Sequence, residues 1–330
     1  MSITIELKMS GKSVGADLQD YLQSVSYREA LDGEADTLEV TLHDIKGLFM
    51  SSWFPSRGTM IEIILNDGEQ LLPLGDFYVD EIENSFPPSE CKIKGTSIPP
   101  QSTVKAAEKW RSWEHAKLRQ IAEDIAQSGG LKVYYEADYD PTLDRAEQSD
   151  ESDLKFLHRL CKDNGLALKL NDKQLIIFDI ERYEKAAPVL TIEKGTSKVK
   201  RFSARSTLNE IYSACEVKYD DGDSKKIFVG QSAGGLISKL FKGSGKKLKV
   251  NKRVSNAGEA DRLARKKLKE KNRKETKVQL TMMGSFYLRA GATIDLKNFA
   301  VFDGKYLIQK ATHTVGSGGY ETTIEISKVN

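Results

Sequence analysis

The segment Gln148–Gly165 constrains the fold more than any other part of this 330-residue chain. It carries an apolar stripe at helical spacing, made of Leu154, Phe156, Leu157 and Leu160. Asp150 can cap a helix, and Asp153 lies three residues further on, at the positive end of the helix dipole. Gly165 supplies the left-handed residue that ends many helices. The segment therefore predicts one amphipathic helix with both ends defined.

Strand-like runs surround this helix. Leu166–Leu170 and Gln174–Phe178 follow it and are joined by a short polar turn, which predicts a hairpin. Upstream, the pattern predicts a helix over Trp113–Ala126, a stop at Gly129-Gly130 and a strand over Leu131–Tyr135. These elements form a predicted α/β module over residues 101–187.

The ordered series over Ser112–Phe178 resembles the phage late control D family of contractile-tail baseplate hub proteins. The shared pattern is a tryptophan-led helix, a Gly-Leu strand, the helix Gln-Ser-Asp-Glu-Ser-Asp-x-x-Phe-Leu-x-Arg-Leu and a Gly-Leu hairpin. Phages, tailed bacteriocins and other injection devices share such hubs. The resemblance implies a structural protein that needs no cofactor.

The flanking segments, residues 1–100 and 188–330, consist of short alternating runs divided by Gly, Pro and Asn/Asp turns, which is typical of small barrels or sandwiches. We therefore expect a mainly β, α+β fold, with two small antiparallel β-barrels and the α/β module between them. The first segment has predicted strands over residues 2–9, 37–42, 60–65, 75–82 and 90–94. The second has them over 198–204, 211–219, 225–230, 247–254, 277–283, 293–297, 305–315 and 320–327, interrupted by a basic helix over 256–274.

The two β segments repeat one order of strands. Arg57–Leu65, Gly75–Val79 and Cys91–Lys94 correspond to residues 290–296, 304–308 and 322–326. Three copies of a chain with two similar barrels present six similar units in a ring. In the family that the chain resembles, this arrangement joins a sixfold tail tube to a threefold spike, so the resemblance implies a homotrimer. The expected partners are the tube protein, a spike on a separate polypeptide and other baseplate proteins, with DNA able to pass through the lumen.

Composition excludes several other classes. A net charge of +2 excludes a general polyanion binder, although local charge can still act. Three scattered cysteines indicate buried thiols of a reducing compartment, and no apolar run approaches the length of a membrane span. We expect the chain to reside in the cytoplasm during assembly and then in the tail particle.

No catalytic, metal or cofactor residues are predicted. His158 and Cys161 are three apart on one helix, but a zinc site needs two more ligands. The acidic residues of 138–153 lack the glycine and the alternation of a calcium loop. A tail-associated cell-wall hydrolase and a DNA-contacting tail protein are the alternatives to a hub.

Three stretches are candidate contact surfaces. The helix over 256–274 exposes a predicted basic surface of Arg262, Arg265, Lys266, Lys267 and Lys269, which suits plain solvation, an acidic partner surface or DNA passing through a tail. Residues 232–245 carry an apolar face of Leu236, Ile237, Leu240 and Phe241 on a piece too short to be a stable helix alone, so it is predicted to order against a neighbour. Trp53 and Phe54 form the third, as either a contact or a barrel plug.

Overall fold

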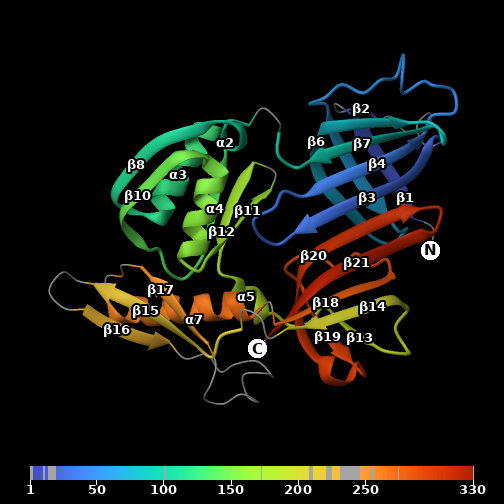
Figure 1. Ribbon diagram of the computed structural model, residues 1–330. Helices are drawn as coiled ribbons and strands as arrows, with labels where there is room; N and C mark the ends of the chain where they lie inside the picture. The colour runs from blue at the N-terminus through green and yellow to red at the C-terminus, as the bar shows by residue number, and fades with distance from the viewer. Residues whose placement is uncertain are drawn as a thin grey trace.

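A computed structural model of the chain describes residues 3–9, 12–13, 20–99, 102–171, 173–207, 211–220, 225–230, 246–252, 254, 256–273 and 275–329 (Figure 1). The first β segment forms β1 (Thr4–Met9), β2 (Lys12–Ser13), β3 (Leu22–Ala30), β4 (Thr37–His43), β5 (Met60–Asn66), β6 (Leu71–Ser85) and β7 (Glu90–Thr96). Alternation places one apolar face of these strands inward, and Val25, Val40, Ile63, Phe77 and Ile93 meet in one core. The sequence pattern missed β3.

The second β segment forms β13 (Leu190–Glu193), β14 (Val199–Ser206), β18 (Thr276–Met283), β19 (Thr293–Lys297), the short 3-10 helix η1 (Ala300–Phe302), β20 (Gly304–Gly316) and β21 (Gly319–Lys328). Its inward side chains, among them Leu280, Ile294, Tyr306 and Ile324, form a second core. Only β13 was not expected here.

The two β segments are not two separate barrels, which corrects the prediction. Thirteen strands belong to one sheet, and no closed barrel is detected among the described residues. The junction is the antiparallel pair of β20 with β3, from Lys310 opposite Ala30 to Gly316 opposite Ser24. Sequence periodicity gives the faces of a strand but not the neighbour along its edge, so it could not show this junction.

The internal repeat is nevertheless present in the topology. We define the first unit as β1, β3, β4, β5, β6 and β7, and the second unit as β13, β14, β18, β19, β20 and β21. The neighbours in the first unit run β3-β4-β7-β6-β5-β1, and those in the second run β14-β18-β21-β20-β19-β13. Numbered by chain order, both read 2-3-6-5-4-1. The one difference is that β1 pairs antiparallel with β5 whereas β13 pairs parallel with β19.

Local irregularities recur at matching positions in the two units. In the ladder of β3 with β4, the residue Gln23 is skipped, and in the ladder of β14 with β18, the residue Lys200 is skipped. In the ladder of β6 with β7, the residue Asp80 is skipped, and in the ladder of β20 with β21, the residue Gln309 is skipped. Since a β-bulge depends on local twist and is not a general property of strands, two coincident bulges argue for a true duplication.

In the sequence, the α/β module comes between the two units. It contains α2 (Thr103–Ala106), β8 (Glu108–Lys117), α3 (Leu118–Gly129), β9 (Lys132–Glu136), β10 (Thr142–Ser152), α4 (Asp153–Asp163), β11 (Ala167–Asn171), β12 (Gln174–Phe178) and α5 (Ile180–Glu184). The hairpin β11–β12 and the strand β9 are confirmed. The helix predicted from Trp113 begins instead at Leu118, because Trp113 belongs to β8, which pairs with β10. Asp150 is likewise in β10, and Ser152 caps α4 by accepting from Lys155 N.

A separate lobe is inserted between β14 and β18. It consists of β15 (Ala214–Asp220), β16 (Lys225–Gly230), β17 (Lys247–Asn251) and α7 (Ala257–Asn272), and it lies beside the module in Figure 1. Leu263, Ala264 and Leu268 of α7 pack on Cys215 and Val217 to form the lobe's own core. Asn256 caps α7 by accepting from Glu259 N at 2.9 Å, as the sequence predicted. No helix within the described ranges is long and apolar enough to cross a bilayer.

Candidate interaction surfaces

The loop between β4 and β5 presents exposed apolar side chains. Within ten residues, Ile45, Met50, Trp53 and Phe54 all remain accessible, and Phe54 is 54% exposed. Trp53 packs edge-on against Tyr21 and Phe49, with ring centroids 5.9 Å apart in both pairs. Phe49 is the residue that fills the core, so Trp53 is a half-exposed lid over it and Phe54 projects beyond. This geometry suits a contact surface, and the assignment of Trp53 and Phe54 to an interface stays a prediction.

The first part of this loop has a defined shape because Asp44 is hydrogen-bonded on both sides. Phe49 N donates to Asp44 Oδ1 at 3.1 Å, and Asp44 N donates to Ser89 O at 2.9 Å. A fixed loop loses less conformational entropy when it binds, so exposed apolar residues on it are better placed for a partner than on a free loop. The other predicted apolar contact, Leu236, Ile237, Leu240 and Phe241, lies outside the described residues.

The basic helix α7 faces acidic residues of its own chain. Lys266 Nζ lies 2.7 Å from Asp179 Oδ2, and Lys269 Nζ lies 3.0 Å from Glu184 Oε2. Arg273 donates to the same Glu184 at 2.9 Å. Lys266 is buried, Lys267 and Lys269 are partly buried, and Arg262 stacks on Tyr139. Of the five residues predicted as a basic surface, only Arg265 is exposed, beside Asp261 at 3.5 Å.

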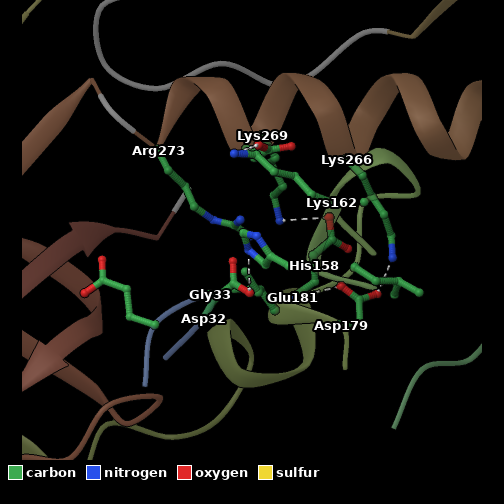
Figure 2. Close-up of a pocket in the computed structure, with 14 residues that line it drawn as sticks. Asp32, Gly33, His158, Lys162, Asp179, Glu181, Lys266, Lys269 and Arg273 are labelled. Carbon is green, nitrogen blue, oxygen red and sulfur yellow. Dashed lines mark hydrogen bonds and ion pairs between the residues drawn. The ribbon is translucent and has the colours of Figure 1, made fainter. Parts of the chain in front are cut away.

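A polar pocket of about 290 Å³ lies where the lobe, the module and the first unit meet. Figure 2 shows Lys266 and Lys269 of α7, and Arg273 directly after it, above Asp179 and Glu181, with His158 of α4 pointing toward Asp32. His158 Nε2 is 3.6 Å from Asp32 Oδ1. Acidic and basic side chains line the pocket in similar numbers, so it has no strong preference for an anion or a cation.

Two glycines at this pocket allow neighbouring segments of the chain to approach closely. Gly33 has φ +72°, and a Cβ there would lie 2.5 Å from His158 Nε2. Gly165 has φ +70°, and its Cβ would lie 2.8 Å from Lys266 Cβ. The residue that ends α4 therefore also sets how near α7 can come, and any other residue would push the lobe away.

A second polar cluster lies at the junction of both units and the module, and no sequence pattern predicted it. Glu29 of β3 accepts from Arg289, which lies between β18 and β19, and Lys169 Nζ of β11 lies 3.2 Å from Asp36 Oδ2. Burial raises the pKa of Asp36, although the Lys169 ammonium opposes the shift. Burial raises the pKa of Glu29, but the hydrogen bonds and charge of Arg289, together with Lys169 and Ala290 N, outweigh it and lower that pKa. The first unit contributes Glu29 and Asp36, the second unit Arg289 and the module Lys169, so the cluster joins these three parts.

The described residues hold no group of three or more His, Cys, Asp or Glu side chains that suits a metal ion. Cys161 is buried in the module core and His158 faces the pocket, so the pair does not converge. Within the acidic run, Asp153 is buried between Lys109, whose Nζ is 2.6 Å away, and Arg111. Its role is to join α4 to β8. The free thiols of Cys91, Cys161 and Cys215 are buried, as expected.

Comparisons with known proteins agree with this fold. A protein described as "Probable baseplate hub protein" of Escherichia phage P2 is 30% identical over 165 residues, which cover 48% of this chain and 41% of that protein. The chain thus matches less than half the length of this relative. The crystal structure of a 43 kDa tail protein of prophage MuSo2 from Shewanella oneidensis has a TM-score of 0.74 at 16% identity, covering 99% of this chain and 98% of that one.

An Escherichia coli component of the type VI secretion system has the same fold, with a TM-score of 0.60 at 16% identity, over 98% of this chain and 77% of that one. A family model described as phage tail baseplate hub (GPD) matches residues 98–319. That span includes the module, the lobe and most of the second unit. The chain therefore belongs to the phage tail baseplate hub family, a family of structural proteins and not of enzymes.

Proposed function

We propose that the chain is the central hub of a contractile tail or injection device, and that three copies form a ring with pseudo-sixfold symmetry. One face of the ring joins the sixfold tail tube, and the other joins a threefold spike. The hub is assembled in the cytoplasm with other baseplate proteins and then remains in the particle. The observation that carries the proposal is the duplication, since the two units share one strand order and both bulges.

The physical reason is a mismatch of symmetry. A threefold protein cannot make equivalent contacts with a sixfold ring unless each chain offers two similar surfaces. Two copies of one unit per chain supply them, so three chains offer six. The exposed loop with Trp53 and Phe54 lies between strands 3 and 4 of the first unit. The matching position in the second unit carries the half-exposed Tyr287, so both units present an aromatic side chain there.

Neither alternative gains support from the site. The cell-wall hydrolase does not agree with the structural family. The DNA-contacting protein depended on the basic helix, whose charges are largely paired with Asp179, Glu181 and Glu184 of the same chain. DNA passage through a ring needs no such contact.

The test has two measurements. Sedimentation of the purified chain at increasing concentration is expected to give a species of three chains. Electron microscopy of that species, or of the particle, is expected to show six similar densities around one axis. A closed ring of two, four or six chains contradicts the proposal.

A further inference from the structure

The junction between the two units of one chain provides a template for a contact between chains. Near the start of β20, Ile308 is hydrogen-bonded to the residues directly before β19, the fourth strand of the second unit. Ile308 N donates to Ala292 O, and Gly291 N donates to Ile308 O, both at 2.9 Å. From Lys310 onward, the same edge of β20 pairs with β3 of the first unit. One long strand thus serves two neighbours in succession.

The first unit repeats this arrangement up to the same point and then stops. Val79 N donates to Thr59 O at 2.9 Å, and Gly58 N donates to Val79 O at 2.7 Å, which are the same two bonds at the same two positions. Beyond the bulge at Asp80, the strand β6 continues to Ser85 with β7 on one side. Among the described residues, nothing pairs with its other edge.

The complementary edge lies at the other end of the sheet. β14 occupies in the second unit the position that β3 occupies in the first, and within the described part of the chain it pairs only with β18. β3 uses its second edge for β20, whereas the second edge of β14 is open. Unpaired strand edges of this kind are templates for another chain.

We propose that β6 of one chain pairs antiparallel with β14 of the next copy, so that one continuous sheet passes from chain to chain. This inference rests on the proposed trimeric hub. Carrying the β20–β3 register over to the matching strands gives four opposed pairs: Ile82 with Ser206, Glu83 with Arg205, Asn84 with Ala204, and Ser85 with Ser203. The pair Glu83–Arg205 replaces Thr312–Arg28 of the internal junction.

Charge on the two edges is complementary in this register. On the β6 edge, Glu81 and Glu83 form ion pairs with Lys94 at 2.8 and 3.6 Å, and Glu83 also stands directly opposite Lys92 of β7. On the other edge, Arg205 stands directly opposite Lys277 of β18, a like-charge pair that destabilises a ladder when nothing compensates it. Glu83 of the next chain would compensate it.

An unsatisfied polar atom lies at the same edge. Asn84 Oδ1 is buried and has no hydrogen-bond partner among the described residues. Native structures leave few such atoms, and each indicates a missing donor. In the proposed register Asn84 opposes Ala204 of the next chain, so the strand edge that carries the unpaired oxygen is the edge that the pairing would cover.

A cysteine cross-link tests the register. Ser85 and Ser203 are both exposed and directly opposed, so the full-length chain carrying Ser85→Cys and Ser203→Cys is expected to form covalent dimers and trimers on mild oxidation. The control carries Ser85→Cys and Ala204→Cys, which differ by one residue and point to opposite faces. It is expected to remain uncross-linked, because a slip by one residue reverses the face of every side chain.

A charge exchange tests the pairing independently. Glu83→Arg and Arg205→Glu are each expected to weaken the association of chains about fivefold per contact, and the double exchange is expected to restore it. If the wild-type chain forms trimers and the Ser85–Ser203 pair gives no cross-link, the strand pairing is wrong and the hub proposal survives. If the wild type stays monomeric at every concentration and no cross-link forms, both are overturned.

Discussion

Arg289 donates to both carboxylate oxygens of Glu29, from Nε to Oε2 at 2.7 Å and from Nη2 to Oε1 at 3.1 Å. The two residues are 260 positions apart and belong to different units. Ala290 N adds a third hydrogen bond to the same carboxylate at 3.3 Å. Because Glu29 is buried, this contact fixes the loop between β18 and β19 against β3, next to the β20–β3 junction.

Removing one partner leaves the other charge buried. We expect Arg289→Met to lower the free energy of unfolding by about 2–3 kcal/mol, since the buried carboxylate of Glu29 would lose two charged hydrogen bonds and keep only Lys169 Nζ, 3.6 Å away, and Ala290 N. Urea denaturation measures this change. The control is Lys94→Met, which removes an exposed ion pair with Glu81 and should change stability by less than about 1 kcal/mol. Equal effects of the two substitutions would contradict the assignment.

His313 predicts a loss of stability in mild acid. Burial, followed by the nearby Arg289, lowers its pKa from 6.5 to about 4. Its Nε2–H donates to Leu288 O at 3.1 Å, and Nδ1 lies 2.7 Å from the hydroxyl of Tyr320, so the neutral form is the bonded one. The unfolded chain binds a proton below pH 6.5 and the folded chain does not until about pH 4. Stability therefore falls by roughly 3 kcal/mol between those values.

The check is a comparison of pH profiles. His313→Gln cannot protonate, so its unfolding free energy should lack the His313 part of the slope between pH 6.5 and 4. Glu29 and Asp36 are present in both proteins, and their contributions cancel in the difference. Parallel profiles for the two proteins would show that His313 does not titrate in this way.

Gly165 at the pocket and Gly68 in the turn between β5 and β6 both have positive φ, so comparing them separates backbone strain from contact. Gly68→Ala has φ +91° and open space, so it should cost about 1 kcal/mol of strain alone. Gly165→Ala adds an approach of 2.8 Å to Lys266 and should cost about 1–2 kcal/mol more. Thermal unfolding of both variants measures the difference. An equal cost would mean that α7 moves away freely.

The contact of α7 with α5 consists mostly of ion pairs, so it should depend on salt. We expect Glu184→Gln to increase hydrogen exchange across Ala257–Asn272, because Glu184 is the shared partner of Lys269 and Arg273. High salt should narrow the difference from the wild type. Asp261→Asn is the control, since its pair with Arg265 is exposed. If hydrogen exchange is the same in both variants, the ion pairs do not hold the lobe against α5.

The exposed loop gives a prediction on assembly without a change in folding. Phe54→Ser should alter the unfolding free energy by less than about 0.5 kcal/mol, because the side chain is exposed. It should nevertheless reduce incorporation of the hub into particles, which electron microscopy can count. Phe49→Ser is the matched control, since it empties the core and should destabilise the chain by several kcal/mol, about 3 by analogy with other large core truncations. Normal particles with Phe54→Ser would exclude this loop as a contact.

Alternation and capping predicted most individual elements correctly. The helix α7 starts at its capping Asn256, and the ends of β4, β5, β16, β18 and β19 lie within a residue of the predicted ranges. Errors in the module arose where contacts between distant residues override a local sequence pattern. Glu108–Lys117 is rich in residues that favour helices, and only its pairing with β10 makes it a strand. Asp150 and Asp153 looked like a cap, although one lies in a strand and the other in a buried ion pair.

The candidate site was less predictable, because charge on a sequence does not show its partner. Lys266 and Lys269 read as an exposed basic face, and the acidic residues of α5 that pair with them lie about eighty-five positions away. The repeat was detectable in three strands, from Gly75 and Gly304 with the aromatic runs after them. Its extension to six strands needed the ladder registers.

The insertion of the lobe between β14 and β18 has a consequence for any ring built from this chain. In the first unit the corresponding link is the short turn from Leu31 to Asp36. The second unit of each chain therefore carries a lobe at this link, and the first unit does not. Going around three chains, the outline alternates, and every second position carries an appendage. A partner that binds the lobe therefore finds three sites on the ring, whereas a partner that binds the repeated units finds six.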